Sequence, residues 1–111
     1  PLMMKRKQGT IVNMASVASI KAYQHGGSYG ISKYALLGFS KNLREEMKEY
    51  GIRVVSIMPG AVKTPSWDGV DVPAERLMPA SDIAELVWTA CSLSNRTVVE
   101  DIVVRPALGD L

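Results

Sequence analysis

Tyr29 and Lys33 are separated by one helical turn in the stretch SYGISKYALLGFSKNLREEM, which begins at Ser28. Residues four apart on a helix face the same side, with Cβ atoms about 5–6 Å apart. A lysine ammonium at that distance favours the phenolate over the phenol, and the positive end of a helix N-terminus acts in the same direction. An aromatic hydroxyl with a labile proton can protonate a carbonyl oxygen or deprotonate an alcohol. The pair therefore predicts a proton donor and acceptor at the start of a helix.

A serine and a proline–glycine turn are expected beside this pair. Ser16 follows the apolar run that ends at Met14, and Pro59-Gly60 follows a second apolar run. In an α/β protein, sites form at the carboxyl ends of the strands. Ser16 would then lie close enough to bind the same substrate oxygen as Tyr29 through a hydrogen bond.

The elements that would position these residues alternate between strands and helices. Two buried strands are predicted at Thr10–Met14 and Arg53–Met58, and a third lies within Val98–Val104. A helix over Ser28–Tyr50 connects the first two strands, and a second helix opens at Asp82 with a pattern that resembles a capping box. This order predicts an α/β fold that contains half of a doubly wound parallel sheet, with about three parallel strands and flanking helices.

The long helix has a predicted buried face and a predicted solvated face. Its charged residues, Arg44 among them, are expected mostly on the solvated face. The first strand is too apolar to be a comfortable sheet edge, which predicts a neighbour along it, either a missing half of the domain or a second copy. The buried stripe is predicted from apolar residues at spacings of three and four, which are Leu36, Phe39, Leu43, Met47 and Tyr50.

The bulk properties fit a globular domain and argue against several other classes. Of the 111 residues, 47% are hydrophobic and 22% are charged, which argues against a disordered chain. A net charge of +2 with scattered basic residues gives no support for a nucleic-acid partner. No apolar run approaches the ~20 residues of a membrane span. The single cysteine, Cys91, allows neither an internal disulfide nor a zinc cluster, so a reducing, cytoplasmic setting is the default expectation.

Four segments carry a resemblance to a known family. The stretches GTIVNMASVAS, SYGISKYALLGFSKNLREE, GIRVVSIMPGAVKTP and DIVVRP resemble, in this order, the C-terminal half of the short-chain dehydrogenases/reductases. A bare Y-x-x-x-K is a weak motif, but Ser16 before it and PG-x-V-x-T after the next strand make the combination specific. The resemblance implies a Rossmann-like dinucleotide-binding domain, with residues 1–111 forming its C-terminal half and the N-terminal glycine-rich half absent from this chain.

The resemblance also implies an activity, that of an NAD(P)(H)-dependent oxidoreductase that interconverts a carbonyl and an alcohol. In that activity Tyr29 is the catalytic acid/base, and Lys33 hydrogen-bonds the nicotinamide ribose and assists Tyr29. Ser16 binds the substrate oxygen. The implied substrate is a small carbonyl or alcohol compound, and the implied cofactor is NAD or NADP.

The turn after the second strand is implied to bind the cofactor. Pro59 and Gly60 would pass close to the nicotinamide, where a side chain would obstruct. The backbone of Val62 and the hydroxyl of Thr64 would fix its carboxamide. The long helix is implied to pack against its counterpart in a second subunit, which predicts a homo-oligomer, a dimer or a tetramer. Neither a nucleic acid, a membrane nor a metal is expected as a partner.

Two other functions remain open from the sequence. The chain could be a catalytically incompetent fragment of the family that serves only as a structural or assembly unit, because the glycine-rich phosphate turn is not among these residues. A serine hydrolase that uses Ser16 and His25 is the other possibility. It requires a G-x-S-x-G nucleophile elbow, whereas the residues around Ser16 read NMASVA.

Overall fold

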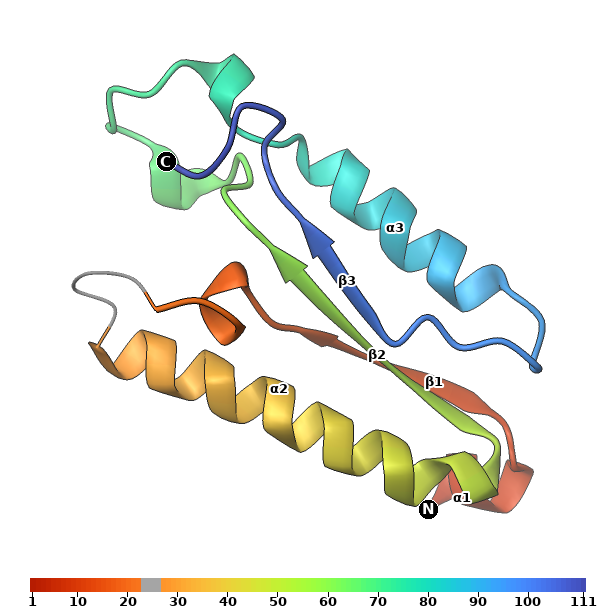
Figure 1. Cartoon of the computed structure of the whole chain (residues 1–111). Helices are drawn as coiled ribbons and strands as arrows, with labels where there is room; N and C mark the ends of the chain where they lie inside the picture. The colour runs from red at the N-terminus through yellow and green to blue at the C-terminus, as the bar shows by residue number, and fades with distance from the viewer. Residues whose placement is uncertain (23–26) are drawn as a thin grey trace.

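The structure, a computed structural model, describes residues 1–22 and 27–111. Its centre is a sheet of three strands, β1 (Gly9–Met14), β2 (Ile52–Pro59) and β3 (Asp101–Val104), in the order β1-β2-β3 (Figure 1). Both neighbouring pairs are parallel. The predicted half of a doubly wound parallel sheet is therefore confirmed, and β3 lies within the range predicted for the third strand.

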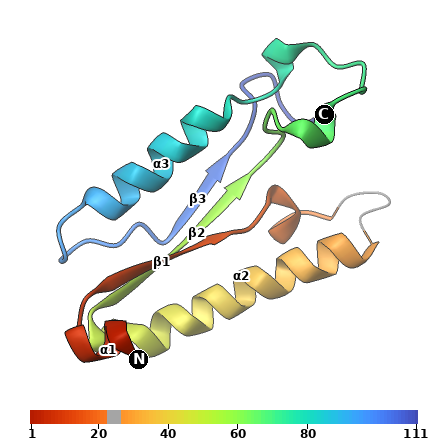
Figure 2. The same cartoon turned by 180° about the vertical axis from the view of Figure 1, so that it is seen from behind.

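One short helix precedes the first strand, and helices and short 3₁₀ turns connect the strands. They are α1 (Leu2–Arg6), η1 (Val17–Ser19), α2 (Gly27–Met47), η2 (Lys48–Tyr50), η3 (Pro65–Trp67), η4 (Ala74–Arg76) and α3 (Ala80–Ser92). Figure 1 and the reverse view in Figure 2 show α2 along one face of the sheet and α3 along the other. A parallel sheet requires this double cover because both of its faces are apolar.

β2 is the central strand, and its side chains are buried on both faces. Val55 and Ile57 belong to a cluster with Ala90 of α3, whereas Met58 packs with Leu37 of α2. Successive side chains of a strand point to opposite faces. The continuous apolar run in the sequence follows from this burial on both sides.

The buried face of α2 differs from the predicted stripe. Its buried residues are Leu37, Ser40 and Arg44, again at spacings of three and four. Phe39 was predicted to be buried but is 58% exposed, and Arg44 was predicted to be solvated but is only 8% exposed. The other members of the predicted stripe are half-buried. The buried face differs from the predicted one because the sheet offers polar partners as well as apolar ones. For example, Asn13 Nδ2 donates a hydrogen bond of 2.6 Å to Ser40 Oγ.

Arg44 ties α2 to the sheet. Its Nε donates to the main-chain oxygen of Val54 at 2.9 Å. Its Nη2 donates to the main-chain oxygen of Glu100 at 2.6 Å and to Asp101 Oδ1 at 3.0 Å. A buried guanidinium is tolerated only when its donors have partners of this kind. Arg44 therefore fixes the position of α2 relative to β2 and to the start of β3.

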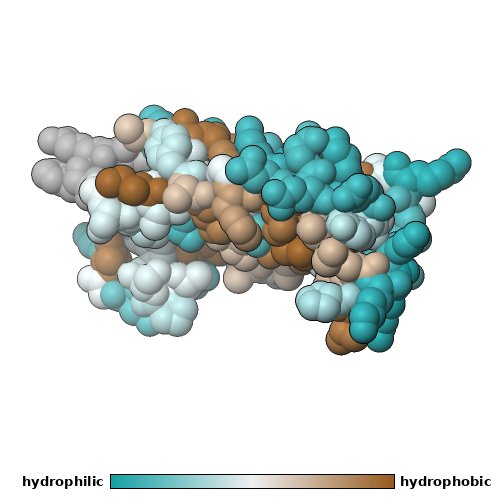
Figure 3. Space-filling view, turned by 90° about the horizontal axis from the view of Figure 1, so that it is seen from below, coloured by the Kyte–Doolittle hydropathy of each residue, from teal (hydrophilic) through white to brown (hydrophobic). Residues whose placement is uncertain are grey.

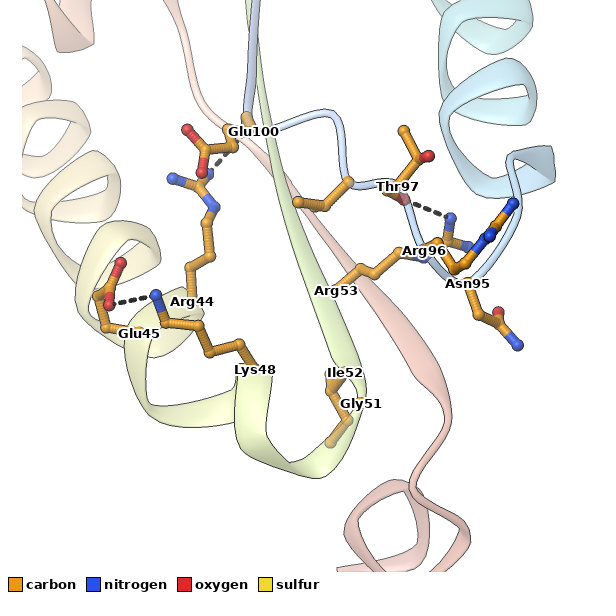
Figure 4. A pocket seen from close by; sticks show the side chains of 11 residues that line it. Arg44, Glu45, Lys48, Gly51, Ile52, Arg53, Asn95, Arg96, Thr97 and Glu100 are labelled. Carbon is orange, nitrogen blue, oxygen red and sulfur yellow. Dashed lines mark hydrogen bonds and ion pairs between the residues drawn. The ribbon is translucent and has the colours of Figure 1, made fainter.

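A second arginine, Arg53, closes the C-terminal end of α3. Its guanidinium donates to Thr10 Oγ1 and to the main-chain oxygens of Cys91 and Leu93, at 2.9, 2.9 and 3.1 Å. The last carbonyls of a helix lack partners within the helix, so this contact satisfies them. Arg44 and Arg53 line a cavity of ≈ 180 Å³, in which Figure 4 shows both side chains and the bonds from Arg44 to Glu100 and from Arg53 to Thr97. Both guanidinium groups donate hydrogen bonds to main-chain oxygens, so they stabilise the fold.

The start of α3 does not follow the prediction from Asp82. α3 begins at Ala80 after Pro79, and no side chain caps it. The predicted capping box is therefore wrong, but Asp82 lies in the first turn, where a negative charge suits the positive helix end. Among the residues that the structure describes, no helix has the length and apolarity needed to cross a membrane.

Arg44→Met tests the attachment of α2. Methionine keeps the unbranched aliphatic part of the side chain but lacks the guanidinium donors. We therefore expect the free energy of unfolding of the complete protein to fall by about 2–3 kcal/mol. Denaturant unfolding gives this value. The control is Lys48→Met, because Lys48 pairs with Glu45 at 2.7 Å on the exposed surface, where such a pair contributes about 0.5 kcal/mol. Equal losses in the two variants would contradict the role given to Arg44.

Candidate active site

A pocket of ≈ 360 Å³ opens at the carboxyl ends of β1 and β2. It is built from the segment after β1, the start of α2 and the turn that leaves β2, which Figure 1 shows at the same end of the sheet. Except for Lys33, all of the predicted site residues line it, namely Ser16, Tyr29, Pro59, Gly60, Val62 and Thr64. The structure therefore brings together residues that lie far apart in the sequence.

Ser16 is held rigidly at the start of η1. Its Oγ accepts a hydrogen bond of 3.1 Å from the main-chain N–H of Ala18, and its own N–H donates to Ser19 Oγ at 3.3 Å. This reciprocal arrangement is a capping box. Ser16 thus caps a turn and also lines the pocket. Because its oxygen accepts from Ala18, its O–H remains a donor that can point elsewhere.

Tyr29 and Lys33 lie at the first turns of α2. The ammonium of Lys33 is 5.6 Å from the centroid of the Tyr29 ring, which is a cation–π geometry. Lys33 Nζ also donates to the main-chain oxygen of Met14 at 3.3 Å. Tyr29 is 57% exposed. The last carbonyl of β1 therefore holds the lysine beside the tyrosine, at the rim of the pocket.

The turn Pro59–Thr64 is fastened on two sides. The N–H of Gly60 donates to the main-chain oxygen of Val104 at 2.8 Å. Val62 forms a parallel bridge with Met78. These main-chain bonds hold the turn against the end of β3 and against the segment before α3. They leave its outer surface as one wall of the pocket.

Comparison with protein families identifies the chain. The family model described as short chain dehydrogenase matches residues 1–72. The chain belongs to the short-chain dehydrogenase family. The resemblance predicted from the sequence is therefore confirmed, and the matched range includes the segments from β1 to the turn after β2.

Curated relatives extend beyond the chain. The sepiapterin reductase of Chlorobaculum tepidum is 38% identical over 111 residues, which cover 99% of this chain and 46% of that protein. The dehydrogenase/reductase SDR family member 6 of Danio rerio is 48% identical over 67 residues, which cover 60% of this chain and 27% of that protein. The chain thus spans less than half the length of these relatives.

Solved structures of the family share the fold. A β-ketoacyl-[ACP] reductase from Bacteroides thetaiotaomicron superposes with a TM-score of 0.79 at 31% identity, over 96% of this chain and 44% of that chain. The closed form of a serine dehydrogenase complexed with NADP⁺ gives a TM-score of 0.79 at 29% identity, over 91% of this chain and 45% of that chain. The three strands and their helices are therefore the arrangement of this family.

The sequence did not indicate every residue of the pocket. Asp110 and Leu111, which no sequence pattern indicated, also line it, together with Val17, Ala61, Ser66 and Trp67. The hydroxyl of Ser66 lies 2.6 Å from that of Thr64, and the short spacing of these two residues could have suggested it. No sequence pattern around Asp110 predicted its place in the pocket, because this residue reaches the pocket only through the turn of the chain after β3.

The hydrolase alternative depends on a pairing of Ser16 with His25. His25, its proposed base, lies outside the described residues. Ser16 itself begins a short 3₁₀ turn after β1 and caps it with its side chain. A nucleophile elbow instead carries its serine in a sharp turn between a strand and a helix. The local structure therefore supports a binding role for the Ser16 hydroxyl over a nucleophilic one.

Gly60→Ala tests how closely the turn packs against the chain after β3. A Cβ at Gly60 would lie 3.2 Å from Pro106 Cδ, so we expect the free energy of unfolding to fall by about 1 kcal/mol. The matched control is Gly30→Ala in α2, where a Cβ meets nothing within 4 Å and alanine should stabilise by about 0.5–1 kcal/mol. Denaturant unfolding should show opposite signs, and stabilisation by both changes would contradict the close packing at Gly60.

Proposed function

We propose that the complete protein is an NAD(P)(H)-dependent oxidoreductase that interconverts a carbonyl and an alcohol. The observation that carries this proposal is that Ser16 and Tyr29 line one pocket, with the Lys33 ammonium against the Tyr29 ring. Residues 1–111 would be the C-terminal half of one dinucleotide-binding domain. We also propose a cytoplasmic location, for which the single cysteine is the support.

The described residues can move a proton to and from a substrate oxygen. In this proposal Tyr29 gives its proton to a carbonyl oxygen in reduction and takes one from an alcohol in oxidation. The Ser16 hydroxyl donates to the same oxygen and orients it. The Lys33 cation stabilises the negative charge that remains on Tyr29 when its proton has left. The three groups have complementary tasks at one end of the sheet.

The pocket also fits the nicotinamide end of the cofactor. Gly60 presents no side chain at the wall, Pro59 flanks it, and Val62 and Thr64 offer main-chain and hydroxyl groups suited to a carboxamide. Lys33 would bind the ribose. When bound, NAD or NADP supplies or accepts the hydride. The serine dehydrogenase with the same fold is complexed with NADP⁺, which supports this class of cofactor.

A non-catalytic fragment is the second candidate. The chain spans 46% of the length of the sepiapterin reductase that it resembles, so these residues alone do not supply every part of such an enzyme. The glycine-rich turn that binds cofactor phosphates would have to come from outside these residues. Titration of NADH or NADPH fluorescence distinguishes the two candidates. Binding by the complete protein supports the enzyme, and absence of binding supports the fragment.

Tyr29→Phe tests the proton-transfer role. The change removes only the hydroxyl, so we expect kcat to fall at least about 100-fold while cofactor affinity stays within a few-fold of the parent. Steady-state carbonyl reduction and cofactor fluorescence measure the two effects. Tyr34→Phe is the matched control, because Tyr34 is exposed on the same helix but does not line the pocket. Near-normal turnover by the Tyr29 variant would refute the assignment.

We further infer that the protein forms a homo-oligomer through the outer face of α2. Ile31, Tyr34 and Phe39 are exposed on this helix. Figure 3 views the molecule from the α2 side: hydrophobic and hydrophilic surfaces are mixed along it, and hydrophilic side chains gather at the end away from the grey atoms. Exposed aromatic and aliphatic side chains on one helix are typical of a subunit interface. A dimer needs this face alone, and a tetramer requires a second one.

Phe39→Glu tests this interface. A charge in a subunit contact should raise the dissociation constant of the oligomer at least about 30-fold, since one central interface residue often contributes 2 kcal/mol or more. Light scattering after size exclusion measures the mass. The control is Val70→Glu, because Val70 is also an exposed apolar residue but lies between η3 and η4. An unchanged mass for the Phe39 variant would exclude this face.

A further inference from the structure

The chain beyond β3 returns to the pocket. After Val104 it turns at Pro106, where the N–H of Gly109 donates to the main-chain oxygen of Pro106 at 2.9 Å. Gly109 has φ of +98°, a backbone conformation that favours glycine. The turn sends Asp110 and Leu111 into the lining of the same pocket as Ser16 and Tyr29. Figure 1 shows this last segment beside the chain that follows β2.

Three basic side chains hold the returning segment in place. Asp110 Oδ1 lies 3.3 Å from Arg105 Nε, and Asp110 Oδ2 lies 3.9 Å from Lys21 Nζ. Arg76 Nη2 donates to the main-chain oxygens of Gly109 and Asp110, at 3.3 and 3.5 Å. These contacts come from the segment after η1, from η4 and from the end of β3. The segment is therefore a fixed wall of the pocket, and its carboxylate has a defined position.

The carboxylate of Asp110 lies beside the turn that leaves β2. A Cβ built on Gly60 would be 3.6 Å from Asp110 Oδ1. Gly60 in turn lines the pocket with Tyr29 and Ser16. A small molecule whose reacting oxygen is at Tyr29 and Ser16 would therefore have Asp110 among its possible second contacts.

We propose that Asp110 is a specificity-determining residue that binds a hydrogen-bond donor of the substrate. This inference rests on the proposed carbonyl–alcohol activity. An ionised carboxylate only accepts hydrogen bonds and offers about four acceptor positions, so one that already pairs with cations can accept another bond. The carboxylate favours substrates with an O–H or N–H group near the reacting carbon. It disfavours analogues with a methyl group there, because the carboxylate would then lose water without gaining a hydrogen bond.

The charges around Asp110 narrow the class of donor. Lys21 and Arg105 pair with the carboxylate, and Arg76 binds the main-chain oxygens of Gly109 and Asp110 beside it, so positive charge exceeds negative charge at this place. A cationic substrate would be repelled by these groups. The preferred partner is therefore a neutral donor, such as the hydroxyl group of an α-hydroxyketone.

Two ketones of similar size test the proposal. Hydroxyacetone and butan-2-one differ by a hydroxyl in place of a methyl group. In the complete protein we expect Asp110→Ala to lower the ratio of kcat/KM for hydroxyacetone to that for butan-2-one by about tenfold, because only hydroxyacetone loses a bond to a charged acceptor. Asp110→Asn, which keeps the shape of the side chain, should lower the ratio in the same direction. Asp68→Ala is the control, since Asp68 is an exposed acidic residue after η3 that does not line the pocket.

Each result bears on a separate claim. An unchanged ratio in both Asp110 variants would overturn the role of Asp110 and leave the proposed reaction intact. Equal losses on both ketones, with a raised KM for the cofactor, would assign the carboxylate to the cofactor and also overturn it. If the parent protein reduced neither ketone with NADH or NADPH, the proposed reaction would fail, and this inference would fail with it.

Discussion

The attachment of α2 to the sheet is the contact on which the rest of the structure depends. One face of the helix carries Lys33, Leu37, Ser40 and Arg44, and each of these residues meets the sheet or its extension. The apolar contact at Leu37 favours burial but does not define a direction along the strands. The polar contacts define the position along the strands, because a hydrogen bond tolerates only a few tenths of an ångström of change in its donor–acceptor distance. They set where the helix begins.

That position decides whether a site can form. β1 and β2 are parallel, so their carboxyl ends share one edge, and α2 starts at this edge because it leads from one strand to the other. The carbonyl of Met14 fixes Lys33 there, and Arg44 fixes the opposite end of the helix on β2 and the residues before β3. A helix held at both ends cannot slide along the sheet. The start of α2, which carries Tyr29, therefore keeps its place relative to the end of β1, which leads to Ser16.

The sequence predicted the elements, and the gathering of Ser16, Tyr29 and the turn after β2 at one end of the sheet, because these features depend on local patterns. Strands, helix spacing, and the positions of Tyr29 and Lys33 follow from short-range periodicity. The buried face of α2 was predicted incorrectly because its polar residues are buried by partners distant in sequence: Arg44 meets Asp101, and Ser40 meets Asn13. A charged residue in a helix is predicted to be solvated unless partners that could bury it are known. The place of Asp110 in the pocket was not predicted for the same reason, because this residue reaches the pocket only through the turn after β3.

These long-range contacts divide the pocket into two kinds of wall. Ser16, Tyr29 and the turn at Gly60 come from the segments that carry the family resemblance, and in the proposed activity they would act on the carbonyl or alcohol group that all substrates share. The returning segment lies beyond the residues 1–72 that the family model matches, and it adds Asp110 to the lining of the pocket. Its position depends on Arg76 and Arg105, which act on the segment from outside the pocket lining. If the proposed roles hold, substrate choice would change through this wall while Ser16, Tyr29 and the attachment of α2 to the sheet stay the same.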